Sequence, residues 1–177
     1  MRCLRQDCAG APGVMKGRRG PLAAAAAVLI ADRGTKLWID QNVSAWDVWP
    51  VIPGVLNIIH AENRGMAFSL LASAADPLRS IVLVVLASVV LALVGWMWWR
   101  SESEIERWAL ALVTGGAAGN LWDRVLRGSV TDFIDLYYRD WHWATFNIAD
   151  SAITAGAILL GLQLLLAPKQ EPARRVS

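Results

Sequence analysis

Apolar residues along the chain collect in blocks long enough to cross a membrane. Residues 78–99 carry a single charge, Arg79, and residues 152–167 carry none, while 146–151 can extend the second block to crossing length. A membrane-spanning helix needs roughly 20 predominantly apolar residues. Both blocks are therefore predicted to be transmembrane helices.

Two further blocks are interrupted by charge. Residues 22–31 are apolar, but three charged residues at positions 32, 33 and 36 interrupt the continuation of this block. Residues 108–122 are mostly apolar and then meet the adjacent charges Asp123 and Arg124. We interpret all four blocks as spans, with boundaries near 22–40, 78–99, 105–126 and 146–167.

The segment between the first two spans, 41–77, is predicted to lie outside the membrane. Within it, 44–71 contains alternating and β-branched residues, and Pro50, Pro53 and Gly54 exclude a long helix, so we expect short strands at the membrane surface. The pattern as a whole predicts an all-α membrane protein with four transmembrane helices. One domain over 21–167 would lie between tails formed by 1–20 and 168–177.

Basic residues predict the orientation of the spans. Lys and Arg are concentrated before the first span, between the second and third, and after the fourth. Since cytoplasmic loops carry an excess of Lys and Arg, both termini are predicted to be cytoplasmic. From pattern alone, the first span could instead be a cleavable signal peptide, because a basic lead precedes a short apolar core.

Composition narrows the class of protein further. The 177 residues are 55% hydrophobic and 18% charged, whereas a soluble domain is typically about 25% charged. A net charge of +2 is too small to indicate nucleic-acid binding. The two cysteines, Cys3 and Cys8, lie in the N-terminal tail and have neither zinc-site spacing nor a disulfide framework.

The unusual polar residues converge on one zone. With the predicted orientation, the outer half of the membrane holds Asp32, Glu62, Asn63, Asn120, Asp123, Arg124, Asp132, Asp135, Asn147 and Asp150. A carboxylate within a membrane costs about 2.5–3.5 kcal/mol on insertion scales, so a functional site is the default hypothesis. Structural ion pairs are the alternative: Asp123 with Arg124, and Asp32 with Arg33 or Lys36. Gly115 and Gly119 form a small-xxx-small pair that favours close helix packing.

The chemistry available in this zone is that of carboxylates. The chain has two His and no HExxH motif, which argues against zinc peptidase chemistry, and it has no GxSxG motif. A Ser69–Lys36 dyad lacks any supporting motif. Two Asp that share a proton can activate water and protonate a leaving amine, with one carboxyl as base and the other as acid.

Five motifs resemble those of lipoprotein signal peptidases (signal peptidase II). Residues 32–36 resemble D-x-x-T-K, 63–69 resemble N-x-G-x-A-F-S, and 115–124 resemble G-G-x-x-G-N-x-x-D-R. Residues 130–135 resemble V-x-D-F-x-D, and 146–151 resemble F-N-x-A-D-S. Each motif alone is weak, but five in order over about 22–166 are specific.

The resemblance implies an intramembrane aspartic endopeptidase whose catalytic pair is Asp132 and Asp150. The implied enzyme would need no metal and no cofactor. The fold it implies is four transmembrane helices with a small extracytoplasmic β-cradle. The supporting or substrate-binding residues it implies are Asp32, Lys36, Asn63, Gly65, Gly115, Asn120, Asp123, Arg124 and Asn147.

The resemblance also implies the substrate and the location. The substrate would be a prolipoprotein whose Cys carries diacylglycerol, cut just before that Cys, and globomycin-type cyclic peptides would inhibit. The protein would be a multi-pass, monomeric component of the bacterial cytoplasmic (inner) membrane, in contact with its lipids, with its active site on the extracytoplasmic side. Since Asp32 belongs to the implied site, the first helix is expected to be retained. Residues 1–14 are expected to be dispensable or a mis-called start, because Met15 would make an ordinary start.

Two other classes of function stay open from the residues alone. A small transporter or lipid-handling protein could use the acidic residues as a proton relay. A signal-anchor assembly factor could use them as a structural belt. For a transporter, substitution of Asp132 or Asp150 would change a flux. For an assembly factor, the same substitutions would destabilise the fold. In neither case would they abolish proteolysis.

Overall fold

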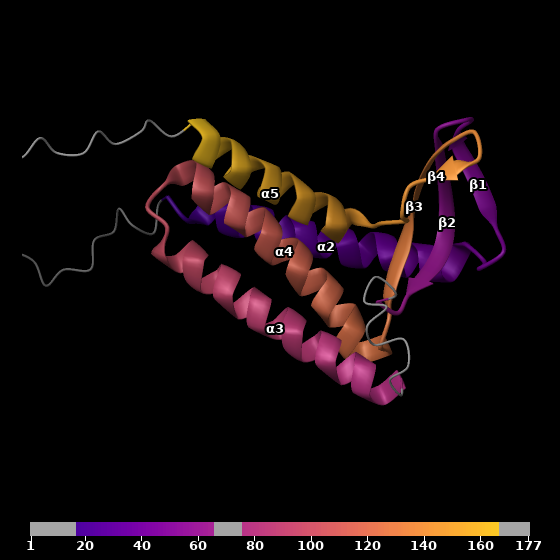
Figure 1. The fold of residues 1–177 in the computed structure, drawn as a ribbon, viewed down its shortest axis with the longest axis horizontal. Coiled ribbons are helices and arrows are strands. Elements are labelled where there is room, and N and C mark those ends of the chain that lie inside the picture. Colours follow the sequence, from indigo (N-terminus) through magenta and orange to yellow (C-terminus); the bar gives the residue numbers. More distant parts are fainter. Residues whose placement is uncertain (1–16, 66–75, 167–177) are drawn as a thin grey trace, which may run out of the picture.

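The computed structural model describes residues 17–65 and 76–166. Ser69, Cys3 and Cys8, most of the predicted N-terminal tail and all of the predicted 168–177 tail lie outside these ranges. The described chain is mostly helical, with four helices and a small antiparallel sheet at one end of the bundle (Figure 1). The helices are α2 (Arg19–Asn42), α3 (Asp76–Arg100), α4 (Glu104–Arg127) and α5 (Ile148–Leu166).

The four helices occupy the four segments predicted from the hydrophobic pattern. In the described ranges, α3 and α5 are the helices long and apolar enough to cross a membrane by composition, over Leu78–Arg100 and Ile148–Leu166. Helices α2 and α4 carry more charge, and several of these charges are buried inside the protein: Asp32, Lys36 and Asp123 have no exposed surface. The interruptions seen in the sequence are therefore interior polar groups of a helix bundle.

Helix α4 packs against the other three helices, and glycines allow the close approach. A Cβ atom added at Gly115 would lie 2.6 Å from the backbone oxygen of Ala25 in α2. A Cβ at Gly116 would collide with the backbone oxygen of Ala149 in α5. A Cβ at Gly156 of α5 would lie 2.6 Å from the backbone oxygen of Ala109 in α4. The small residues of α4 thus serve helix packing, as the Gly115–Gly119 spacing predicts.

The sheet has the order β1-β2-β3-β4, formed by β1 (Val48–Ile52), β2 (Leu56–Asn63), β3 (Val130–Tyr138) and β4 (Trp141–His142). The short strands expected within 44–71 are confirmed by β1 and β2. Strand β3 was not predicted, because residues 130–138 were interpreted only as a connection. Phe133 of this strand joins Ile39 and Val43 at the end of α2 in a small buried cluster, which fixes the sheet to the bundle.

Candidate active site

The first turn of α5 carries a reciprocal cap. The side-chain oxygen of Asn147 accepts a hydrogen bond from the backbone N–H of Asp150 at 2.9 Å. In return, Oδ2 of Asp150 accepts from the backbone N–H of Asn147 at 3.3 Å. This is the geometry of a capping box, which satisfies two backbone donors at a helix N-terminus. The cap fixes the rotamer of Asp150 as well as the start of the helix.

Asp132 lies on β3, 1% exposed, where both of its oxygens are held by amides. Nδ2 of Asn147 donates to Oδ1 of Asp132 at 2.7 Å, and Nδ2 of Asn63 donates to Oδ2 at 2.9 Å. Asn63 reaches this position from the end of β2, which pairs antiparallel with β3. Asn147 thus bonds both aspartates: Asp132 through its side-chain amide and Asp150 through its cap.

Asn120 of α4 completes the polar contacts of Asp150. Its Nδ2 donates to Oδ1 of Asp150 at 2.7 Å. Its Oδ1 accepts from Nδ2 of Asn147 at 3.2 Å and from Nζ of Lys36 at 2.9 Å. Each of these acceptor and donor roles uses the Asn amide in one orientation only, so the network specifies how Asn120 is turned.

Lys36 lies beneath this layer, fully buried between two carboxylates. Its Nζ is 2.8 Å from Oδ2 of Asp32 and 2.8 Å from Oδ2 of Asp123. Lys36 also donates a hydrogen bond to Asn120, so the buried ammonium charge is balanced by two carboxylates and one amide oxygen. The second oxygen of Asp32 accepts from the backbone N–H of Ala149 at 3.0 Å, in the first turn of α5.

Asp123 forms its ion pairs with α2. Its two carboxylate oxygens contact Arg33 and Lys36. The expected alternative of a pair with its sequence neighbour Arg124 is not what the described structure contains. The guanidinium of Arg124 instead donates to the backbone oxygen of Asn120 at 3.2 Å and lies within Coulombic range of both Asp150 and Asp132.

Burial raises the pKa of Asp132 to about 6, and the charge of Asp150 acts in the same direction. The hydrogen bonds from Asn63 and Asn147 act the opposite way but are outweighed. A carboxyl with this pKa exchanges a proton readily near neutral pH, as a general acid or base requires.

Gly65 shapes the chain just after Asn63. Its φ is +77°, a conformation that L side chains rarely adopt, and its N–H donates to Oδ1 of Asn63 at 2.8 Å. A Cβ at this position would lie 2.5 Å from the side chain of Leu83 in α3. Gly65 thus orients the amide that holds Asp132.

The structure therefore brings together nearly all of the predicted site residues. Asp32, Lys36, Asn63, Asn120, Asp123, Asp132, Asn147 and Asp150 form one hydrogen-bonded network, with Arg124 beside it and Gly65 behind Asn63. Gly115 lies apart, against Ala25. Sequence reasoning missed Arg33 as the partner of Asp123. In the described ranges, no group of three or more His, Cys, Asp and Glu is arranged to hold a metal ion.

Known proteins resemble this chain over most of its length. The family model described as signal peptidase (SPase) II matches residues 24–166. The chain belongs to the signal peptidase II family. Members of this family are proteases, so the polar network lies in a peptidase.

Curated members of the signal peptidase II family match over most of their own length. A lipoprotein signal peptidase of Solibacter usitatus (strain Ellin6076) is 47% identical over 152 residues, which are 84% of this chain and 92% of the relative. One from Geobacter sulfurreducens is 39% identical and covers 77% of this chain and 86% of the relative. An Escherichia coli lipoprotein signal peptidase is 44% identical and covers 80% of this chain and 87% of the relative.

Two solved structures share the fold. A bacterial membrane enzyme determined by the in meso method at 2.3 Å resolution is 30% identical, with a TM-score of 0.75, over 89% of this chain and 94% of that one. A second bacterial membrane enzyme, determined by the same method at 1.9 Å resolution, is 31% identical with a TM-score of 0.73. The match covers 84% of this chain and 94% of that one. This signal peptidase II family member is therefore a membrane protein.

Proposed function

We propose that the chain removes the signal peptide from diacylglyceryl-modified prolipoproteins, cutting just before the lipidated Cys with Asp132 and Asp150 as an aspartic dyad. The observation that carries the proposal is the position of Asn147, which bonds both carboxyls at once. A partner shared by two acids from different elements, β3 and α5, supports the proposal that both act on one water molecule.

In the proposed reaction, the ionised member of the dyad takes a proton from a water molecule, and the oxygen of this water attacks the scissile carbonyl. The protonated member then gives its proton to the leaving amine as the C–N bond breaks, which yields a carboxylic acid and an amine. The raised pKa of Asp132 favours this residue as the proton carrier. Two nearby carboxyls titrate as a pair, so one proton between them is the expected resting state.

The supporting residues have positioning roles in this scheme. Asn63, Asn120 and Asn147 hold the dyad oxygens, and Asp32, Lys36 and Asp123 hold Asn120 and the start of α5. The charge of Arg124 lies close enough to both dyad carboxyls to favour negative charge developing there.

We propose that all four helices cross the cytoplasmic membrane of a bacterium, with both termini cytoplasmic and the sheet on the outer side. Helices of 24 residues are about 36 Å long, enough for a hydrocarbon core of about 30 Å. The enzyme is proposed to act as a monomer without a cofactor, among membrane lipids, and to be inhibited by globomycin-type peptides. The division into a peptidase domain and two tails stays a prediction.

Replacement of either dyad residue tests the proposal. Asp132→Asn and Asp150→Asn are each expected to lower the cleavage rate of a lipidated prolipoprotein by roughly a thousandfold, because general acid–base catalysis is lost. Asp140→Asn, in the exposed β3–β4 turn, is the matched control. Purified protein in detergent and a synthetic diacylglyceryl substrate give the rates, and binding of a globomycin-type peptide reports an intact fold.

The result also separates the alternatives. Variants that cleave normally but change an ion or lipid flux would favour a proton relay. Variants that fail to insert or unfold, with inhibitor binding lost, would favour a structural belt of acids. Either outcome would overturn the aspartic mechanism.

A further inference from the structure

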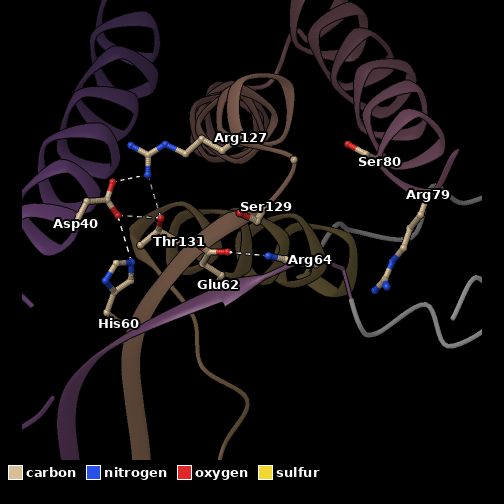
Figure 2. Close-up of a pocket in the computed structure, with 10 residues that line it drawn as sticks. Asp40, His60, Glu62, Arg64, Arg79, Ser80, Arg127, Ser129 and Thr131 are labelled. Atoms are coloured by element: carbon tan, nitrogen blue, oxygen red, sulfur yellow. Dashed lines mark hydrogen bonds and ion pairs between the residues drawn. The ribbon is translucent and has the colours of Figure 1, made fainter. Parts of the chain in front are cut away.

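A second polar site lies on the other face of the sheet. A cavity of about 710 Å³ is lined by residues of α2, β2, α3, α4 and β3, and neither Asp132 nor Asp150 is among them (Figure 2). Glu62 and Thr131 are directly paired between β2 and β3, as are Ala61 and Asp132. Since neighbouring residues of a strand point to opposite faces, Glu62 and Thr131 face the cavity and Asp132 faces away from it.

The charges of the cavity leave one cation in excess. Asp40 is already bonded on one side of the cavity, where Arg127, Thr131 and His60 surround its carboxylate (Figure 2). Glu62 pairs at 3.5 Å with Arg64, and both of these side chains are more than half exposed. Arg79 is the third arginine of the lining, against the two carboxylates of Asp40 and Glu62, so the cavity carries a net positive charge.

Arg79 is the residue that indicates a ligand. It extends from the first turns of α3 on the opposite side of the cavity from Asp40 (Figure 2). Its Nε atom is buried and has no hydrogen-bond partner among the described residues. Arg79 lines the cavity and pairs with no carboxylate among the described residues, so the terminal N–H groups of its guanidinium can donate to an acceptor there. The hydroxyl groups of Ser80 and Ser129 line the same space.

The position of Arg79 identifies the source of that acceptor. The residues of α3 around Arg79 include the exposed Leu78, Ile81 and Val82, and almost none of the apolar span of this helix is covered by protein. An anion that meets Arg79 therefore lies beside a surface suited to acyl chains. A phosphodiester carries one negative charge, which matches the single excess cation of the cavity, and arginine binds phosphate oxygens with a fork of donors.

We propose that this cavity binds the phosphodiester group of an anionic membrane lipid, whose acyl chains lie along α3. The inference rests on the membrane placement of α3 proposed above and does not depend on the dyad. Arg79 and Arg64 hold the phosphate oxygens, Ser80 and Ser129 add hydroxyl donors, and the Asp40–Arg127 pair forms the far wall.

Native mass spectrometry of the full chain in a neutral detergent tests the proposal. Phosphatidylglycerol and phosphatidylcholine with the same acyl chains are titrated separately, since the first is anionic and the second is zwitterionic. One phosphatidylglycerol molecule is expected to bind about tenfold more tightly than phosphatidylcholine, the size of a retained charge-assisted contact. Arg79→Gln is expected to remove that preference, and Arg79→Lys to reduce it about threefold. Arg139→Gln, in the exposed β3–β4 turn, is the control and is expected to keep it.

Three outcomes would overturn the proposal. Equal binding of the two lipids would indicate ordinary annular lipid. An equal preference for phosphatidylglycerol in Arg79→Lys, Arg79→Gln and the control would show that Arg79 is not part of the site. If Arg79→Gln does not fold, the comparison of Arg79→Lys with the control decides. Displacement of the lipid by inorganic phosphate at the same concentration would assign the cavity to a free anion. Asp132→Asn is expected to bind the lipid as the parent does, so a failure of the peptidase proposal is distinguishable from a failure of this one.

Discussion

Lys36 has an interior environment that water cannot reach. Its ammonium group is surrounded by Asp32, Asp123 and Asn120 at 2.8–2.9 Å, and neither Lys36 nor the two aspartates have exposed surface. Removing one partner from such a group leaves buried charge without compensation, which is far more costly than the net value of the ion pair itself. Lys36 is therefore essential to the fold as well as to the orientation of Asn120.

Lys36→Met is expected to destabilise the protein by about 3–5 kcal/mol, because Asp32 and Asp123 lose their common cation. Thermal and denaturant unfolding in detergent measure the loss. Arg33→Gln is the comparison: its side chain is partly exposed, and Asp123 keeps Lys36, so the loss is expected to be smaller. Equal losses in the two variants would contradict the central role of Lys36.

Asp132 leads to a prediction for pH dependence. Because burial raises its pKa from 3.8 to about 6, the folded protein binds this proton more tightly than the unfolded chain does. The stability contributed by the group is therefore fully present below pH 3.8 and is lost as the pH rises through about 6. As the proposed proton carrier, Asp132 is also expected to give kcat/KM an alkaline limb near pH 6.

The measurement is the pH profile of kcat/KM with a lipidated substrate, between about pH 4 and 9. Asp140→Asn is expected to leave the limb where it is. A rate that rises through pH 6 to a plateau would instead make ionised Asp132 the general base, and it would reverse the roles proposed for the two aspartates.

How much of the site could be predicted depends on the residue. The order of the motifs and the orientation of the spans predict that the polar residues meet in one zone, and the hydrogen-bonded network agrees with this. The partner of Asp123 could not be obtained in the same way. Adjacent residues on a helix do not face each other, so Arg124 next to Asp123 was a poor candidate, and the real partners come from α2.

At the scale of elements, the start of α5 combines two tasks. The Asn147–Asp150 capping box satisfies backbone donors of the helix, and the side-chain NH2 group of the same Asn147 donates across to Asp132 on β3. A serine at this position could cap the helix equally well but has no amide to donate. The two tasks can therefore be separated by substitution.

Asn147→Ser is expected to keep most of the stability and to lose most of the activity, since the cap remains while Asp132 loses one of its two amide donors. Asn147→Ala is expected to lose the activity and also about 1 kcal/mol of stability, because the cap is missing. Unfolding curves and cleavage rates of the two variants provide the comparison. A Ser variant with normal cleavage would show that the contact between Asn147 and Asp132 has no catalytic role.

Strand β3 shows why one element escaped prediction. Residues 130–138 contain Val, Thr, Phe, Ile and two Tyr, a composition that favours strands, but two aspartates and membrane flanks made a short connection the simpler interpretation. The aspartates are accommodated by specific partners: Asp135, for example, is buried and bonded by Asn57 and His142. Tertiary contacts of this kind are not visible in a single sequence.

At the scale of the whole molecule, the predicted site residues share one end of the bundle. Helices α2 and α4 end there, α3 and α5 begin there, and the sheet lies across that end (Figure 1). The opposite end carries Glu102 in the short connection between α3 and α4. A membrane around the helices would thus separate the sheet from this connection.

Cysteine labelling tests the proposed topology. In a background with Cys3→Ser and Cys8→Ser, a membrane-impermeant maleimide added to intact spheroplasts is expected to label Asp140→Cys and to leave Glu102→Cys unlabelled until the membrane is opened. Both positions are exposed in the structure, so access alone does not distinguish them. Labelling of Glu102→Cys in intact cells would contradict the orientation.

The bond from the carboxylate of Asp32 to the backbone of Ala149 joins the first helix to the last. Because Asn147 and Asp150 lie at the start of α5, a nascent chain that has released only its first three helices into the bilayer would lack one member of the proposed dyad. Under the proposed function, cleavage would therefore begin only after α5 has joined the other three helices.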